Sequence, residues 1–430
     1  MIKNLLLFVF GLTLSGVAQT KSIRNSPFLT EAKPESVGFS SERLSAIDKM
    51  CQQAIDSNYV PGIVALVARH GKIVLYKAFG KSDNNANRIL KRDDIFRIAS
   101  QSKAITATAV LMLWEQGRFK LDDPISKYIP EFKNPQVLKT FHYSDTTFTT
   151  TPATSEITIR ELLNHTSGIG YGIIDGDERM KMIYQKGGVT DLFTTKQITI
   201  SQSIKKLASL PLHANPGEKF TYSEGLDVLG YFIEVMSGLP FDQYLRKHIF
   251  EPLAMKDTWF YLPSDKTNRL VAVQQKDDAG NWIHYPTTFY DPDYPVKGAK
   301  SFFSGGAGLS STASDYASFL EMYLNGGELN GVRILSRTTV EMILSNQTGT
   351  LFGGGEKFFG LAFSVNNPKA IELGGVGSAG TFEWGGYFNT QYFADPKEGV
   401  IGILMKQTQG SVKDETSWKF RQLIGQSIDD

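Results

Sequence analysis

Ser100-Gln101-Ser102-Lys103, followed by the apolar run 104–114, is the stretch that decides how this chain folds and acts. A serine and a lysine three residues apart on a helix share one face, so the hydroxyl and the amine lie within reach of each other. Burial disfavours the charged form of an amine, and a neutral amine can accept a serine proton. The run is apolar on all sides, which predicts a buried central helix with its positive end beside Ser100. The pattern predicts an activated nucleophile, although a surface serine beside a solvated lysine also fits these four residues alone.

Composition and residue counts exclude several classes of protein. The 430 residues carry 45 basic and 44 acidic side chains, so the charge pattern of a nucleic-acid-binding protein is missing and no nucleic-acid partner is expected. Cys51 is the only cysteine, which excludes an intramolecular disulfide. The six histidines show no metal-binding spacing, and no G-x-S-x-G motif occurs. We therefore expect a chain that buries a large core and needs no metal and no cofactor.

The N-terminus has the pattern of a secretory signal peptide. A short basic segment, residues 1–4, precedes the apolar run 5–17, and Ala18 follows as a small residue. The apolar run is too short to span a membrane as a mature helix. We expect residues 1–18 to be removed by cleavage near Ala18, which gives a periplasmic or secreted protein without stable membrane insertion. A retained N-terminal anchor is the alternative.

The order of the remaining patterns predicts an α/β (α+β) fold. Helical patterns cover 41–57, 226–236, 313–324 and 411–424, and strand patterns cover 63–68, 73–76, 359–365, 381–387, 392–395 and 400–405. Because strands occur near both chain ends, we expect one antiparallel sheet that is flanked by helices and interrupted by a mostly helical inserted subdomain. We expect a single catalytic domain over 34–425, made of an α/β part (34–99 plus 305–425) and a helical insertion (100–304).

Five ordered blocks resemble the serine β-lactamases and penicillin-binding-protein-like hydrolases, on the class C side of that family. The blocks are Phe96–Lys103, Ile157–Gly168, Pro216–Ser223, Gly306–Thr312 and Phe382–Gly386. The resemblance spans roughly residues 35–425 and implies a β-lactamase/transpeptidase-like fold. It is closest to the family VIII carboxylesterases, whose third motif begins with tryptophan.

The resemblance also implies roles for individual residues. Ser100 would be the acyl-forming nucleophile, and Lys103 its base or hydrogen-bond partner. Tyr222 matches the tyrosine that shares proton transfer with the lysine. The backbone N–H groups of Ser100 and Tyr387 would form the oxyanion hole. His165 belongs to a block that resembles a structural turn, so we do not expect it to be catalytic.

Two positions depart from the class C pattern. The third motif, Trp384-Gly385-Gly386, lies on an edge strand in the family and has tryptophan where class C β-lactamases have a lysine that suits a substrate carboxylate. The second motif continues with Glu224 where the family commonly has an asparagine that reads a substrate amide. Glu224 could point inward and pair with Lys103, which would weaken the lysine as a base, or point outward without effect; the sequence leaves both open.

These features together predict a secreted serine hydrolase that forms an acyl-enzyme on Ser100. The loss of the lysine in the third motif favours a carboxylesterase that acts on small neutral esters. A β-lactamase or D-alanyl peptidase of the same fold, acting on an amide, is the first alternative. A non-catalytic cell-wall-binding scaffold is the second, but it would not need Ser100, Lys103 and Tyr222 together. The oligomeric state is left open.

Overall fold

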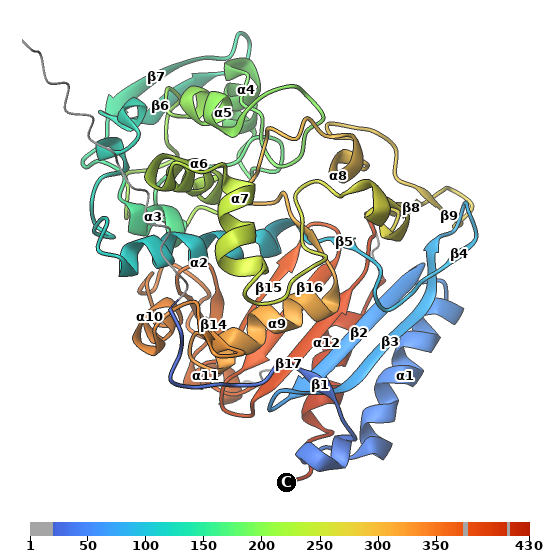
Figure 1. Ribbon diagram of the computed structural model, residues 1–430. Helices are drawn as coiled ribbons and strands as arrows, with labels where there is room; N and C mark the ends of the chain where they lie inside the picture. The colour runs from blue at the N-terminus through green and yellow to red at the C-terminus, as the bar shows by residue number, and fades with distance from the viewer. Residues whose placement is uncertain (1–19, 373–376, 411–412) are drawn as a thin grey trace, which may run out of the picture.

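The computed structural model describes residues 20–372, 377–410 and 413–430. A twisted sheet fills the lower half of the molecule and is covered by helices on both faces, while a largely helical part lies above it (Figure 1). This arrangement confirms the predicted α/β fold class. The predicted signal peptide and its cleavage site near Ala18 lie outside the described residues.

The main sheet joins strands from the two ends of the chain. Its order is β1-β3-β2-β17-β16-β15-β14-β13, with β4 beside β3. The strands are β1 (Thr30–Glu31), β2 (Gly62–Arg69), β3 (Lys72–Asp83), β4 (Arg88–Ile89), β13 (Lys357–Phe359), β14 (Ser364–Asn366), β15 (Phe382–Gly386), β16 (Thr390–Asp395) and β17 (Val400–Met405). The antiparallel pair β2–β17 sets Leu66 opposite Ile403. The short β1 is parallel to β3, which differs from the predicted antiparallel sheet because the N-terminal segment reaches the edge without a hairpin.

One predicted strand is interrupted. The sequence predicts a single strand over 359–365, but β13 ends at Phe359, β14 begins at Ser364, and the residues 360–363 between them form the turn of a hairpin. Ala362 has a φ of +78°, a left-handed conformation that interrupts any strand. The side chains of this turn are nevertheless buried. A buried apolar turn and a buried strand therefore look alike in the sequence.

Successive side chains of β2 point to opposite faces of the sheet and so belong to two separate hydrophobic cores. Ile63, Ala65 and Val67 pack with α1 and α12, whereas the residues between them pack with α2 and α9. The helices are α1 (Ser41–Asp56), α2 (Ser102–Glu115), α3 (Ile159–Leu163), α4 (Glu178–Gly187), α5 (Ile200–Leu207), α6 (Gly225–Ser237), α7 (Phe241–Leu245), α8 (Tyr294–Lys297), α9 (Ala313–Leu324), α10 (Arg337–Ile343), α11 (Pro368–Glu372) and α12 (Thr416–Gly425).

The segment 100–304 is not purely helical. It also carries four short strands, paired as β6 (Gln136–His142) with β7 (Thr147–Pro152) and β8 (Gln274–Lys276) with β9 (Trp282–His284). Helix α3 begins with a capping box, in which the Thr158 side chain accepts from the Glu161 N–H and the Glu161 carboxylate accepts from the Thr158 N–H. Helix α2 lies between this part and the sheet (Figure 1), and its side chains are buried except near its C-terminus.

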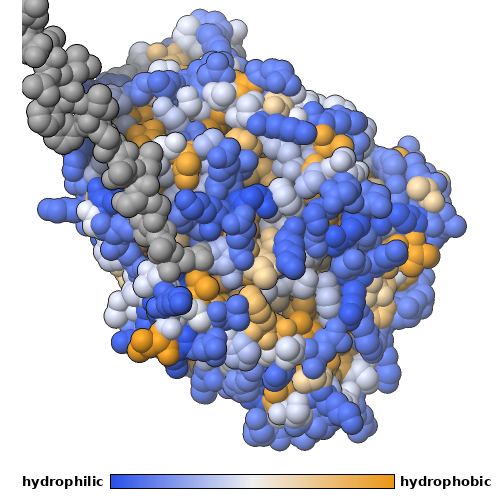
Figure 2. Space-filling model, in the orientation of Figure 1, coloured by the Kyte–Doolittle hydropathy of each residue, from blue (hydrophilic) through white to orange (hydrophobic). Residues whose placement is uncertain are grey.

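The surface of the molecule is mainly hydrophilic on one face. On the face that Figure 2 shows, apolar side chains of the described residues reach the surface only in small separated groups. Among the residues that the structure describes, no helix has both the length and the apolar character needed to span a bilayer.

A buried ion pair fastens the last helix to the sheet. Lys406 follows β17 directly, and its ammonium group contacts the Asp414 carboxylate and donates to Thr416 Oγ1 at 2.8 Å. The side chains of Lys406 and Asp414 are 0% and 5% exposed. Burial alone would raise the pKa of Asp414, but the charge and hydrogen bond of Lys406 outweigh it and hold this pKa below its usual range.

Replacing Asp414 with alanine should destabilise the fold by about 3–5 kcal/mol, because Lys406 would remain buried without its counter-ion. The double variant Lys406→Met/Asp414→Leu should lose less stability than the single variant. Urea unfolding at pH 7 measures the free energy of unfolding of both variants. Because the folded pKa of Asp414 lies below its unfolded value of about 3.9, its contribution is present above that pH and is lost as the pH falls further. A double variant as unstable as the single one would contradict this account.

Candidate active site

The nucleophile predicted by the sequence sits on a strained turn. Ala99 has a φ of +42°, and Ser100 follows it in a single 3-10 turn that leads into α2. The Leu309 N–H donates to Ser102 Oγ at 3.1 Å, and the Ile98 N–H donates to the Leu309 carbonyl at 3.0 Å. These two bonds tie the residues before and after Ser100 to the backbone of Leu309. Ser100 is partly exposed, so a substrate can reach its hydroxyl.

Lys103 lies below Ser100 and is 1% exposed. Its Nζ is 3.4 Å from Ser100 Oγ, 2.8 Å from the Tyr171 hydroxyl and 2.8 Å from the carbonyl oxygen of Gly306. The Gly306 carbonyl can only accept. In a neutral amine, two N–H bonds can serve Gly306 and Tyr171, and the lone pair then faces the Ser100 hydroxyl. This geometry suits a base that takes the serine proton.

Asp227 holds the turn that presents the Gly306 carbonyl. Its Oδ1 accepts from Ser304 Oγ at 2.6 Å and from the Gly306 N–H at 3.1 Å. Burial raises the pKa of Asp227, and the hydrogen bond from Ser304 and the charge of Lys103 act against that increase. The sequence analysis missed this residue, because an aspartate in the first turn of α6 reads as an ordinary helix-terminal charge.

Tyr171, which the sequence analysis also missed, makes the closest side-chain contact to the lysine. Its N–H donates to Asp175 Oδ2 at 2.7 Å, which fixes the loop that carries it. Burial is the main cause that raises the pKa of Tyr171 well above its usual range, so the side chain stays a phenol. It lies three residues beyond the family-like block that ends at Gly168, and this proximity was the one signal available.

Tyr222 lies beside Lys103, but the lysine contacts the face of its ring and makes its hydrogen bond to the Tyr171 hydroxyl instead. Lys103 Nζ is 4.6 Å from the centre of the Tyr222 ring, and the Tyr222 hydroxyl accepts from Trp384 Nε1 at 3.4 Å. His165 packs against the same ring with centroids 4.7 Å apart, and its Nδ1 accepts from the Ser223 N–H at 3.2 Å. Burial and then the charge of Lys103 hold the pKa of His165 well below its usual range. A neutral His165 therefore positions the Tyr222 segment.

The third motif runs along the nucleophile turn. Gly386 ends β15, and a Cβ on it would lie 2.4 Å from the carbonyl oxygen of Ile98. Only glycine permits this approach, which brings the backbone of Tyr387 close to the turn that holds Ser100. The placement suits an oxyanion hole formed by the N–H groups of Ser100 and Tyr387, and that role stays a prediction.

Glu224 points inward, one of the two orientations that the sequence left open. It is 1% exposed, and among the ion pairs of the described residues none joins it to Lys103. Burial and then the charges of Asp191 and Asp227 raise the pKa of Glu224 well above its usual range. The raised pKa favours the protonated form of Glu224, and the described side chains do not form the ion pair with Lys103 that the sequence left open. A direct contact of Glu224 with substrate stays a prediction.

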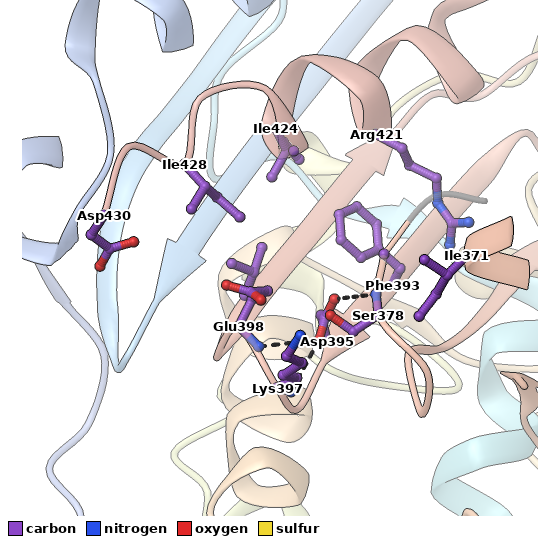
Figure 3. A pocket seen from close by; sticks show the side chains of 13 residues that line it. Ile371, Ser378, Phe393, Asp395, Lys397, Glu398, Arg421, Ile424, Ile428 and Asp430 are labelled. Atoms are coloured by element: carbon purple, nitrogen blue, oxygen red, sulfur yellow. Dashed lines mark hydrogen bonds between the residues drawn. The ribbon is translucent and has the colours of Figure 1, made fainter. Parts of the chain in front are cut away.

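A cavity of about 440 Å³ lies elsewhere, between α12 and the β16–β17 end of the sheet (Figure 3). Phe393 and Ile424 line it, and both belong to the core on the α1–α12 side of the sheet. Ser100, Lys103 and Tyr222 are not among its lining residues. The chemistry is therefore not located at this cavity.

Comparisons with known proteins agree with this geometry. The sequence model of the Beta-lactamase family matches residues 47–426. The chain belongs to the β-lactamase family. It is a serine hydrolase of the kind that includes the β-lactamases and the penicillin-binding proteins, as the sequence predicted.

Relatives in the family have different activities. Esterase EstB of Burkholderia gladioli is 29% identical over 404 residues, which cover 88% of this chain and 95% of EstB. A protein of Escherichia coli strain K12 named as a candidate D-alanyl-D-alanine carboxypeptidase is 27% identical over 414 residues, 92% of this chain and 89% of its own. The solved structure of EstCE1, a hydrolase with promiscuous acyltransferase activity, has a TM-score of 0.74 and 26% identity and covers 89% of this chain and 98% of EstCE1.

Gly386→Ala should lower kcat/KM for hydrolysis by about a hundredfold or more, because its Cβ would push β15 away from the nucleophile turn. Gly385→Ala is the matched control, since its Cβ would meet only the Thr390 carbonyl oxygen at 3.3 Å. Steady-state kinetics of both variants report whether β15 is still aligned with the nucleophile turn. A thermal melt of both reports whether the protein is still folded. Equal losses of activity in the two variants would argue against the close approach at Gly386.

Proposed function

We propose that this chain is a carboxylesterase that acts on small neutral esters through an acyl-enzyme on Ser100. The observation that carries the proposal is Trp384, which stands in the third motif and donates its indole N–H to Tyr222 at 3.4 Å. An indole offers no charge to a substrate carboxylate, whereas it can pack against a neutral ester. The esterase relatives support the same substrate class.

The geometry supports a two-step reaction. Ser100 Oγ attacks the ester carbonyl while its proton passes to Lys103, and the N–H groups of Ser100 and Tyr387 receive the oxyanion. The carbon–oxygen bond to the alcohol breaks, and the alcohol takes its proton from the Lys103–Tyr222 side. A water molecule then attacks the acyl carbon and loses its proton to the same groups, the bond from that carbon to Ser100 Oγ breaks, and Ser100 takes the proton back as the acid leaves.

Export to the periplasm or beyond is part of the proposal. Its support is the N-terminal pattern alone, a short basic segment, an apolar run over 5–17 and a small residue at Ala18. N-terminal sequencing of the protein from an expressing cell would reveal whether cleavage occurs near Ala18. A full-length protein recovered from the cytoplasm would remove this part of the proposal and leave the esterase assignment intact.

The protein should hydrolyse p-nitrophenyl acetate and leave penicillin G and a chromogenic cephalosporin nearly untouched. Trp384→Lys should lower the ratio of kcat/KM for the ester to kcat/KM for the β-lactams by about ten- to hundredfold. The reason is that a charge-assisted hydrogen bond to the β-lactam carboxylate is worth about 1.5–3 kcal/mol. Trp384→Phe is the control, since it keeps an aromatic wall and adds no charge. Efficient penicillin hydrolysis by the unmodified protein, with esters untouched, would favour a β-lactamase instead.

A fluorophosphonate should add one phosphonyl group to the protein, at Ser100. This serine has an amine within hydrogen-bonding reach, and its own N–H and that of Tyr387 are the expected oxyanion hole. Ser100→Ala should abolish the label and lower turnover by several orders of magnitude. Peptide mass spectrometry locates the label, and a modified Ser102 or Ser167 would show that the nucleophile is misassigned.

A further inference from the structure

The position of the proton donor determines where the leaving alcohol must lie. In the proposed reaction the alcohol oxygen takes its proton from the Lys103–Tyr222 side, so it sits within hydrogen-bonding distance of that side. The Tyr222 hydroxyl is 3.4 Å from Trp384 Nε1, and the two ring centroids are 5.7 Å apart. A substituent on the leaving oxygen therefore has the Trp384 ring beside it as a surface to pack on.

Further aromatic rings continue the wall that Trp384 begins. Phe359 packs against Trp384 with centroids 5.3 Å apart and is 1% exposed, so it forms the floor. Phe352 lies 6.5 Å from Trp384 and 5.3 Å from Phe359 by the same measure. Phe220 is the last ring of this group, and its centroid lies 4.7 Å from that of Phe352. Of these rings, Phe220, Phe352 and Trp384 are partly exposed and can be reached by a ligand.

Phe352 comes from a loop outside every block of the family resemblance. The loop connects α10 with β13, and Phe352 lies between Gly349 and Gly353. Both glycines have positive φ values, +59° and +77°, which turn the chain sharply on each side of the phenylalanine. The ring thus reaches the wall from a loop that carries none of the five motif blocks.

We propose that Phe352 and Trp384 form the wall of a subsite for the leaving alcohol, and that Phe352 makes the enzyme prefer esters of flat apolar alcohols such as phenols and naphthols. The inference rests on the proposed esterase function. A flat ring stacks or meets edge to face with both aromatic side chains, whereas a methyl group leaves Phe352 without a contact.

Two acetates with different alcohols isolate this effect. 2-Naphthyl acetate and methyl acetate give the same acetyl-enzyme, so its hydrolysis is identical for both and a change at the alcohol subsite affects kcat/KM for only one. Phe352→Ala should lower kcat/KM for 2-naphthyl acetate by about three- to tenfold relative to methyl acetate. Phe352→Leu should lose less. Where hydrolysis of the acetyl-enzyme limits turnover, the ratio of the two kcat values should stay as in the unmodified protein.

Two controls make the outcome decisive. Phe148→Ala removes the same atoms from an exposed ring on β7 and should leave the ratio of the two kcat/KM values as it is. Methyl esters from acetate to hexanoate vary the acyl group, and Phe352→Ala should not change their order. If Phe352→Ala does not fold, Phe352→Leu decides the result.

Two results would overturn the inference. An equal loss for both acetates would show that Phe352 is structural, and a changed order in the acyl series alone would place Phe352 on the acyl side. Failure of the proposed function looks different, because the unmodified protein would then hydrolyse no ester of either series.

Discussion

The burial of one amine constrains the whole site. Lys103 is 1% exposed on a helix that is apolar on all sides, where an amine without partners would cost several kcal/mol. Ser100, Tyr171 and Gly306 supply these partners at 3.4, 2.8 and 2.8 Å. They come from three separate segments of the chain. Proper folding of all three is therefore a condition for a lysine that can act on the serine.

The carboxyl groups behind the lysine follow from the same constraint. Burial, together with the neighbouring charges, raises the pKa of Glu224 well above its usual range, and Asp191 reaches a pKa of about 6. Of the two, Glu224 is the one that interacts electrostatically with Lys103. Asp191 instead accepts the N–H of Gly172 at 3.0 Å, so it holds the loop that carries Tyr171. Because a pKa of about 6 leaves Asp191 mostly ionised at pH 7, it supports the Tyr171 loop as a charged acceptor.

The parts of the structure that depend on local pattern could be predicted from the sequence. The buried helix after Ser100 is one example, because a run that is apolar on all sides indicates burial. The strands near the two chain ends are another, because their short apolar runs are bounded by turn residues. Tyr171 could not be predicted, since its contact with Lys103 depends on a loop held by Asp175 from four residues further on. The inward orientation of Glu224 likewise depends on tertiary packing. The turn at 360–363 was missed inside the predicted strand 359–365, because its side chains are buried like those of a strand.

The position of β17 in the sheet has a consequence for how the protein is made. This strand lies between β2 and β16, so β2 pairs with β3 on one edge but finds its partner for the other edge only among residues 400–405. A ribosome would have to synthesise almost the entire chain before the central pair can form. Such long sequence separations slow folding and leave β2 with an open edge in the meantime. That edge of β2 therefore stays unpaired until residues 400–405 have been made.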